Sequence, residues 1–350
     1  MESDKMFSGA TINRRKVKNR IIRSATNDHL GNPDGTVSDA EIEMYDSLAR
    51  NEVGTIITGH LSVSPDLKYR ADEMQLSIGD DSYLPGLSRI PAKIHEYDAV
   101  AVAQLSLAGP KGITPFDLNS LSTEQIELIK DWFIEGARRA KEAGFDGVQI
   151  HIAHWYFLQA MVNVDINKRV DKFGGSPENC IRLSKEIVEG IRKKCGDEFI
   201  IMAKMNAHNT NAAEDDYELL AYYCGVLEDA GMDMVEISGA DFTKKNRTDS
   251  LYYLEAVKYL KNALPNLQMS LVGGIYSKQT IDTALETTDF VSLSRALLTQ
   301  PDFVTKLREG AILKSRCLHC NKCFEIFSKK YERCVFGPVL PQLEHSFAHE

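Results

Sequence analysis

The chain has 350 residues, of which 43% are hydrophobic and 26% are charged, as in ordinary globular proteins. Its length suits two or three common domains or one large barrel of alternating strands and helices. No run of 18 uninterrupted apolar residues occurs, so membrane spans are excluded. The net charge of −9 has the wrong sign for general binding to nucleic acid. Residues 1–10 lack the apolar run of a secretion signal, and we therefore expect a cytoplasmic protein.

Short apolar segments rich in β-branched residues alternate along the chain with segments of helical period. Strands are predicted at residues 20–25, 54–63, 99–106, 147–152, 199–205, 234–238, 268–272 and 290–293. Helices are predicted between and after them, at residues 39–50, 86–97, 123–143, 177–194, 213–230, 251–262, 278–285 and 301–309. The first, third and fourth of these helices follow serines of the type that caps a helix, namely Ser38, Ser122 and Ser176.

This alternation predicts a (β/α)8 TIM barrel, because parallel strands need crossover helices and eight such strands close a sheet. A doubly wound sheet is disfavoured because the first strand is not followed by a glycine-rich turn. We place the barrel at residues 1–310 and a short cysteine-rich C-terminal extension at residues 311–350. In such barrels the chemistry lies at the C-terminal ends of the strands.

The last two predicted strands end in Gly273-Gly274 and in Ser294-Arg295. Loops at these two positions of a barrel often bind phosphate, because glycine lets backbone N–H groups approach an anion and arginine adds a permanent charge. The pattern therefore favours a phosphorylated ligand. The alternative is a tight turn without a ligand.

The fourth strand ends in His151-Ile152-Ala153-His154-Trp155-Tyr156. Two imidazoles can donate hydrogen bonds to a carbonyl oxygen, and a tyrosine can give a proton in a pocket poor in water. We interpret this set as one that polarises and protonates a substrate. Two alternatives are a metal site, for which no third ligand is adjacent, and a purely structural pair of histidines.

Two further polar side chains interrupt apolar strands. Lys204 lies in the fifth strand, where an inward ammonium needs an anion or a polar ligand. Gln104 lies in the third strand, where a buried amide needs hydrogen-bond partners that a heterocycle would provide. A lysine that points outward beneath a helix and a glutamine that bonds its own backbone are the structural alternatives.

Several motifs occur together across the barrel region. They are Lys18-Asn19-Arg20-Ile21-Ile22, Ile56-Ile57-Thr58-Gly59, Gln104-Leu105-Ser106, Ala143-Gly144-Phe145-Asp146-Gly147-Val148, His151-x-x-His154-x-Tyr156, Asn167-x-Arg169-x-Asp171-x-x-Gly174-Gly175-Ser176-x-Glu178-Asn179 and the two phosphate loops. Through these motifs, the chain from Lys18 to about Gly310 resembles the old yellow enzyme family of FMN-dependent NAD(P)H oxidoreductases (NADH:flavin oxidoreductases). It is most similar to the branch that includes the barrel domain of bacterial 2,4-dienoyl-CoA reductase.

The resemblance implies FMN across the barrel mouth, with its phosphate on Gly274 and Arg295. The neighbouring residues Gly273 and Ser294 are also expected to bind the cofactor. It places Gln104 on the flavin pyrimidine and Lys204 beside flavin N1 and O2, where a positive charge stabilises the reduced flavin. The family's first-strand segment, which packs against the flavin ring, is matched by Ser24, Ala25 and Thr26. Asn27 takes the position whose side chain tunes the flavin potential.

The resemblance also implies a ping-pong ene-reductase reaction. NAD(P)H reduces the flavin and leaves, and an activated alkene of enone or enoyl type then binds at the same face. His151 and His154 hold the carbonyl oxygen, hydride passes from flavin N5 to the β carbon, and Tyr156 protonates the α carbon.

Some positions depart from the family pattern. Trp155 stands where the family usually has glycine, which suggests a narrowed pocket that selects small or flat substrates. Leu107 and Pro110 replace the usual histidine and arginine, although Lys111 offers a charge nearby, and Cys180 replaces another arginine. These changes bear on the substrate class more than on flavin binding.

Four of the seven cysteines fall in the extension, at Cys317, Cys320, Cys323 and Cys334. Thiolates at such spacing can hold an iron-sulfur (4Fe-4S) cluster or a tetrahedral zinc ion. The resembling iron-sulfur members have a similar cluster after the barrel, with three residues rather than two between the second and third cysteines. A redox cluster here would need an external carrier protein, and reduced thiols without metal are the third alternative.

Three function classes follow from these patterns: an ene-reductase that uses NAD(P)H directly, an iron-sulfur flavoprotein dehydrogenase that exchanges electrons with a separate carrier protein, and a flavin-binding protein without catalysis. As partners we expect a small-molecule alkene, a nicotinamide nucleotide and further copies of the chain in a homo-oligomer, but neither nucleic acid nor a membrane.

Overall fold

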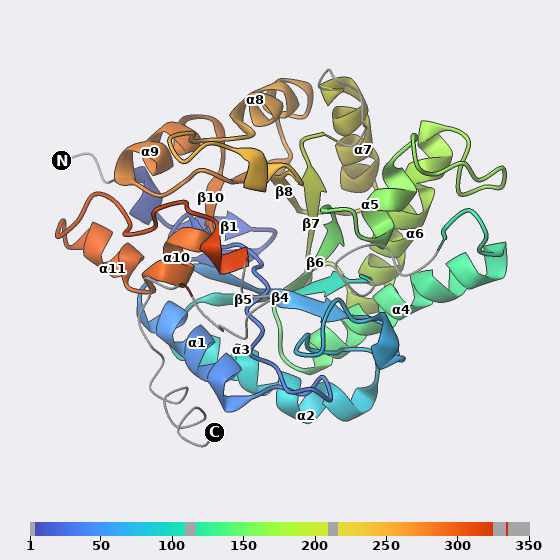
Figure 1. The fold of residues 1–350 in the computed structure, drawn as a ribbon, viewed down its shortest axis with the longest axis horizontal. Coiled ribbons are helices and arrows are strands. Elements are labelled where there is room, and N and C mark those ends of the chain that lie inside the picture. Colours follow the sequence, from blue (N-terminus) through green and yellow to red (C-terminus); the bar gives the residue numbers. More distant parts are fainter. Residues whose placement is uncertain (1–3, 109–116, 209–215, 325–333, 335–350) are drawn as a thin grey trace.

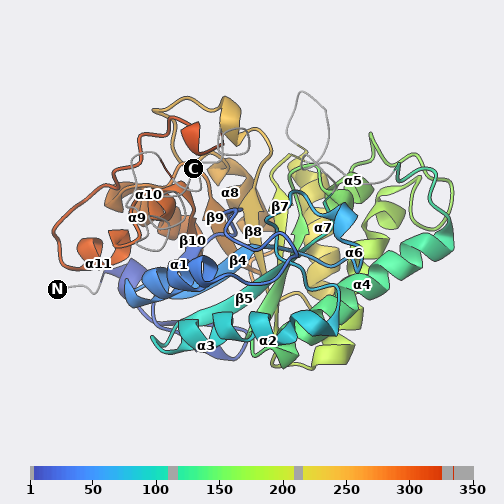
Figure 2. The same cartoon turned by 60° about the horizontal axis from the view of Figure 1, so that its bottom comes forward.

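The structure is a computed structural model that describes residues 4–108, 117–208, 216–324 and 334. Eight parallel strands form a closed barrel in the order β10-β3-β4-β5-β6-β7-β8-β9. Helices surround this ring of strands (Figures 1 and 2). The predicted (β/α)8 barrel is therefore confirmed.

All eight predicted strands are present, and none of their ends differs from the prediction by more than two residues. The barrel strands are β3 (Ile21–Arg23), β4 (Thr55–Ser62), β5 (Val100–Ser106), β6 (Gly147–Ile152), β7 (Ile200–Asn206), β8 (Met234–Ser238), β9 (Gln268–Val272) and β10 (Phe290–Leu293). The sequence analysis did not predict the antiparallel hairpin of β1 (Ala10–Ile12) and β2 (Arg15–Val17).

The larger helices lie where the sequence predicts them. The helices are α1 (Asp39–Arg50), α2 (Leu84–Leu87), α3 (Arg89–His95), α4 (Thr123–Glu142), α5 (Phe157–Val162), α6 (Pro177–Cys195), α7 (Tyr217–Asp229), α8 (Leu254–Ala263), α9 (Lys278–Thr287), α10 (Arg295–Thr299) and α11 (Phe303–Arg308). The predicted helix at 86–97 is wrong in its bounds, because the chain forms two helices that meet at Ser88. The short helices α5 and α10 were not predicted.

The predicted caps at three helix starts are confirmed. The side chains of Ser38, Ser122 and Ser176 each accept a hydrogen bond from the backbone N–H three residues further on. Each cap satisfies one of the N–H groups that the first turn of a helix leaves unpaired.

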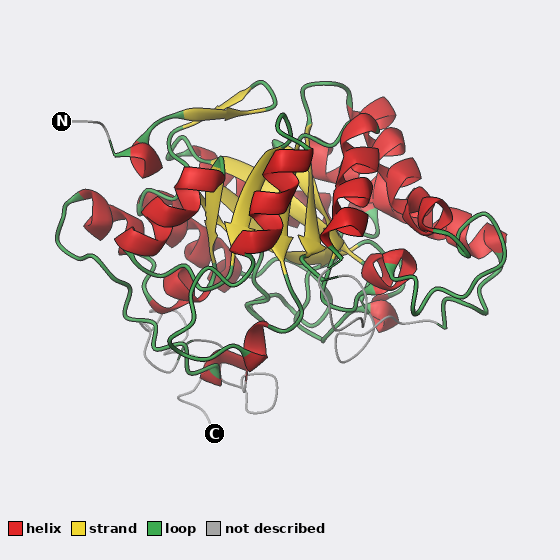
Figure 3. Ribbon diagram, turned by 90° about the horizontal axis from the view of Figure 1, so that it is seen from above, coloured by secondary structure: helices red, strands yellow, loops and turns green. Residues whose placement is uncertain are grey.

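The barrel interior is apolar at its N-terminal end and polar at its C-terminal end. Side chains on a strand alternate between the interior and the surrounding helices. A separate apolar cluster, formed by strand residues such as Ile22, Val102 and Met202, also contains Ile12 and Val17 of the β1–β2 hairpin. The hairpin therefore closes the N-terminal end of the barrel, opposite the loops that follow the strands (Figure 3).

The described part of the extension folds back onto the barrel. Lys314 forms an antiparallel bridge with Ser277, and the Ser315 N–H donates to the Tyr276 carbonyl at 2.8 Å. This segment thus lies against the loop after β9. A boundary at residue 310 remains a prediction. Within the described residues, no helix has both the length and the apolar character that a bilayer crossing requires.

Candidate active site

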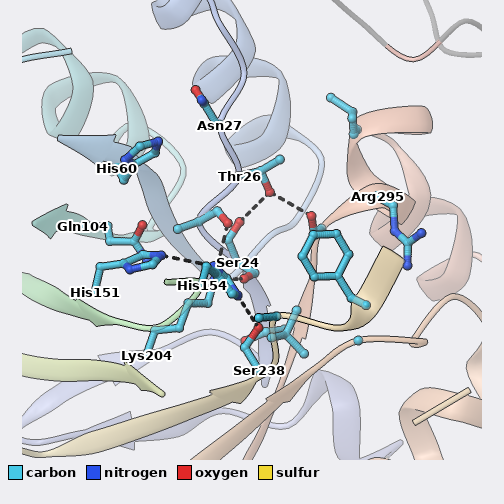
Figure 4. A pocket seen from close by; sticks show the side chains of 18 of the residues that line it. Ser24, Thr26, Asn27, His60, Gln104, His151, His154, Lys204, Ser238 and Arg295 are labelled. Carbon is cyan, nitrogen blue, oxygen red and sulfur yellow. Dashed lines mark hydrogen bonds between the residues drawn. The ribbon is translucent and has the colours of Figure 1, made fainter. Parts of the chain in front are cut away.

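A cavity of about 400 Å³ lies among the C-terminal ends of the barrel strands. Its volume is in the range of ordinary small-molecule sites. Every residue predicted for catalysis or flavin binding lines it: Ser24, Ala25, Thr26, Asn27, Gln104, His151, His154, Tyr156, Lys204, Gly273, Gly274, Ser294 and Arg295. Figure 4 shows most of these side chains around one space. The structure thus brings the predicted set together, while the role of each residue remains a prediction.

A buried ion pair lies just beneath the cavity. Lys204 on β7 and Glu236 on β8 are direct neighbours in the sheet register, and Lys204 Nζ lies 2.8 Å from Glu236 Oε1. Lys204 also donates to Ser24 Oγ at 2.9 Å. The hydroxyls of Ser24 and Ser292 donate to the two carboxylate oxygens at 2.8 and 2.7 Å. The positive charge predicted for this position is therefore balanced by a fully buried carboxylate.

The histidine pair depends on a sharp turn after β6. His154 and Trp155 are consecutive residues in the left-handed region, with φ of 59° and 67°, which is unfavourable for residues other than glycine. This turn sets His154 Nδ1 at 3.2 Å from His151 Nε2, while His154 Nε2 lies 3.0 Å from Ser238 Oγ. The Tyr156 ring stacks on the His151 ring with centroids 4.6 Å apart.

Burial decides the protonation of this group. It lowers the pKa of His154 to about 3, with a smaller contribution from the charge of Lys204. Burial and the neighbouring His154 lower the pKa of His151 well below its usual value. Burial also raises the pKa of the Tyr156 phenol well above its usual value. At neutral pH both imidazoles are therefore uncharged, and the tyrosine keeps its proton.

One side of the cavity carries amides. Gln104 Nε2 donates to Gln149 Oε1 at 2.7 Å, and Gln149 Nε2 is buried without a partner among the described residues. Asn27 donates to Asp72 Oδ2 at 2.9 Å, and it lies apart from the histidines in Figure 4. A ligand with its own donors and acceptors fits the Gln104 side.

The other side of the cavity contains the glycine pair and Arg295. Gly273 and Gly274 have φ of 115° and 70°, and a Cβ on Gly274 would lie 2.7 Å from backbone atoms of Ser250 and Leu251. Only glycine fits such a path. The Arg295 guanidinium donates to Asn321 Oδ1 of the extension and reaches the Tyr252 hydroxyl at 3.4 Å. This set suits an anionic group.

The four cysteines of the extension lie around one smaller cavity beside the first. Cys317, Cys320, Cys323 and Cys334 all line it, and Cys323 lines both cavities. Burial raises the pKa of the Cys323 thiol to about 11. Among the residues that the structure describes, no group of three or more His, Cys, Asp or Glu side chains is arranged to hold a metal ion. The predicted metal ligands thus line one cavity, while their binding of a metal remains a prediction.

Sequence reasoning missed several polar residues here, among them His60, Ser238 and Glu236. His60 and Ser238 line the cavity, and Glu236 supports it from below. A carboxylate within the apolar run Met234-Val235-Glu236-Ile237 was a usable signal, because it repeats the pattern of Lys204 on the preceding strand. His60 follows Thr58-Gly59 in a buried strand, and a titratable residue in that position was also a signal.

Comparisons with known proteins support the family resemblance. The NADH:flavin oxidoreductase / NADH oxidase family model matches residues 5–113 and 111–314. An NADH oxidase of Thermoanaerobacter brockii is 29% identical over 366 aligned positions, which cover 95% of this chain and 56% of the oxidase. The chain thus spans little more than half the length of that relative.

Two solved structures share the fold. A 2-naphthoyl-CoA reductase complex has a TM-score of 0.85 at 22% identity, covering 96% of this chain and 57% of that chain. An old yellow enzyme homologue of Zymomonas mobilis has a TM-score of 0.75 at 21% identity, covering 89% of this chain and 94% of that chain.

The Lys204–Glu236 pair leads to a prediction about stability. Glu236→Gln leaves a buried ammonium without its counter-charge, and we expect a loss of about 3 kcal/mol or more in the free energy of unfolding. Urea unfolding measures this loss. The control is Glu255→Gln, which removes an exposed partner of Lys258 and should change stability by about 0.5 kcal/mol or less. Equal stability of the two variants would show that the buried pair does not stabilise the barrel.

Proposed function

Since the chain belongs to the NADH:flavin oxidoreductase / NADH oxidase family, we propose that it is an FMN-dependent NAD(P)H oxidoreductase that reduces the C=C bond of an activated alkene. The observation that carries this proposal is the juxtaposition of His151, His154 and Tyr156 at one face of the cavity. Enones and enoyl compounds have a carbonyl oxygen, which can accept hydrogen bonds from two imidazoles.

The cavity has the chemistry that FMN requires. The left-handed glycines and Arg295 suit its phosphate. Gln104 suits the polar edge of its ring, and the Gln149 amide nitrogen behind it has no partner among the described residues. When bound, FMN would carry hydride between NAD(P)H and the alkene. The residues proposed to hold FMN are Ser24, Ala25, Thr26, Asn27, Gln104, Lys204, Gly273, Gly274, Ser294 and Arg295.

His151 and His154 would orient the substrate. Each neutral imidazole carries one N–H, and the 3.2 Å contact between His151 Nε2 and His154 Nδ1 uses one of them in a hydrogen bond between the rings. A substrate carbonyl oxygen would replace this bond and accept from both rings. A carbonyl oxygen that accepts from them becomes more electron-poor at its conjugated β carbon. Ser238 contacts His154 and would keep its ring in place.

Tyr156 would supply the proton that completes the reduction. Its raised pKa keeps the phenol protonated, and its half-buried ring stacks on the ring of His151. The phenol gives its proton to the α carbon and regains one from solvent. The reaction then balances as one hydride from NAD(P)H and one proton for each double bond.

We expect Tyr156→Phe to slow alkene reduction by about 10²- to 10⁴-fold, the usual contribution of a general acid. Flavin reduction by NAD(P)H should remain nearly unchanged, because that step needs no proton from the phenol. Anaerobic stopped-flow absorbance measures the two half-reactions separately.

The control for this variant is Tyr223→Phe, which removes a buried hydroxyl that donates to the Val162 carbonyl at 3.0 Å. It should leave both half-reactions intact. Equal loss of both half-reactions in Tyr156→Phe would contradict the role of Tyr156, and a wild-type protein that reduces no activated alkene would contradict the proposed function.

Trp155 leads to a prediction about substrate size. Trp155 lines the cavity, and its backbone lies in the left-handed region. Trp155→Gly should therefore relieve backbone strain and widen the cavity. We expect kcat/KM to rise for bulky enones relative to small ones in a graded series. An unchanged size profile would show that Trp155 does not restrict the substrate.

A second candidate function rests on the four cysteines beside the cavity: an iron-sulfur flavoprotein dehydrogenase that exchanges electrons with a separate carrier protein. Cys323 favours this candidate function, because its side chain lines both cavities. Since the described thiols do not form a closed metal site, we derive no step through a metal.

Metal analysis decides this second candidate. A cluster requires about four irons per chain in protein purified without oxygen, whereas a structural site requires one zinc. Cys320→Ser should remove either metal. This candidate predicts stoichiometric iron that accepts electrons from the flavin, and protein that contains neither metal in stoichiometric amount would contradict it.

A further inference from the structure

A third histidine, His60, faces the cavity from β4. The register between β4 and β5 shifts between the pairs Ile57–Val102 and His60–Gln104, so β4 contains one extra residue there. Such a bulge changes which side chains of a strand point inward. It places His60 beside the inward Gln104, with its ring 5.3 Å from that of Tyr156 and 6.3 Å from that of His151.

The hydrogen bonds of Gln75 determine which nitrogen of His60 carries the proton. Gln75 Oε1 accepts from the Ala71 N–H at 2.7 Å, and Gln75 Nε2 donates to the His60 carbonyl at 3.0 Å. These two bonds fix the orientation of the amide. The same Nε2 lies 2.8 Å from His60 Nδ1. His60 Nδ1 also lies 2.9 Å from Ser106 Oγ, and a hydroxyl can donate to it. Because an amide nitrogen only donates, the contact with Gln75 requires Nδ1 to be an acceptor, and the proton of the neutral ring is on Nε2.

This N–H has no partner in the part of the chain that the structure describes. His60 Nε2 is buried and makes no hydrogen bond to any described residue, while the side chain lines the cavity. Burial lowers the pKa of His60 to about 4, so the ring is neutral at physiological pH. A buried donor without an acceptor is unfavourable, and a ligand oxygen in the cavity would relieve this.

We propose that His60 Nε2–H binds a second acceptor oxygen of the substrate, distinct from the oxygen held by His151 and His154. This inference rests on the proposed alkene reduction. Tyr156 contacts the rings of both His60 and His151, so an alkene carbon that receives its proton lies between two carbonyl-binding positions. The site therefore prefers alkenes activated by two carbonyl groups, as in an ene-dione, over simple enones.

The test compares two substrates that differ in one carbonyl group: 2,6,6-trimethylcyclohex-2-en-1-one and 2,6,6-trimethylcyclohex-2-ene-1,4-dione. We expect His60→Phe, which keeps a ring but removes the donor, to lower the ratio of kcat/KM for the dione to that for the monoketone by about three- to tenfold, the effect of one neutral hydrogen bond. His95→Phe is the matched control, since His95 bonds Asp146 outside the cavity, and it should leave this ratio unchanged.

Equal losses for both ketones would overturn the proposal. A changed flavin affinity or absorbance spectrum with an unchanged ratio would also overturn it, because the acceptor would then be on the flavin. If wild-type protein reduces neither ketone nor any other activated alkene, the proposed function fails. The His60 assignment is then tested by calorimetric binding of the saturated 2,2,6-trimethylcyclohexane-1,4-dione, and equal affinity for wild type and His60→Phe would contradict it.

A measurement on the wild-type protein does not depend on the folding of a variant. Nitrogen-15 spectra of histidine-labelled protein distinguish the two neutral tautomers of an imidazole. We expect His60 to carry its proton on Nε2 and to show a changed Nε2 shift when the dione, but not the monoketone, is bound. A proton on Nδ1 would overturn the proposal.

Discussion

The site depends on a cation that the barrel can bury only because a carboxylate is buried with it. An ammonium without a counter-charge is strongly unfavourable in an apolar interior. Lys204 meets Glu236 at 2.8 Å, and the hydroxyls of Ser24 and Ser292 complete the shell of the carboxylate. This network forms a polar layer above the apolar interior that the N-terminal hairpin closes. It carries positive charge into the cavity while the layer as a whole stays nearly neutral.

That arrangement separates hydrogen bonding from proton transfer. Because the histidines are buried and near Lys204, the pKa values of His60 and His154 fall to about 4 and 3. Neither ring then titrates near neutral pH, so both act as uncharged donors. Tyr156 is the group that keeps a transferable proton, since burial raises its pKa. The residue types alone do not give these protonation states, because the states follow from burial in the folded barrel.

The sequence predicts the barrel well because alternation of strands and helices is a property of each segment by itself. It misses α5 and α10, which are too short for a helical period, and the β1–β2 hairpin, whose stability comes from contacts with the barrel interior. Site residues at strand ends were predictable, since all of them reach one edge of the sheet. Glu236 and His60 were not predicted although each interrupts an apolar strand, and the inward direction of His60 depends on a bulge that the sequence does not indicate. Likewise, cysteine spacing cannot determine whether four thiols close around a metal.

The extension is coupled to the cavity through Arg295. This side chain follows β10, lines both cavities and donates to Asn321, which lies between Cys320 and Cys323. An anion bound at Gly273 and Gly274 would therefore contact the same Arg295 guanidinium as the cysteine-bearing loop. Because five N–H groups are available on one arginine, both partners can be served at once, and occupancy of the cavity would hold the loop in its present place. The extension is then part of the binding site even without a metal.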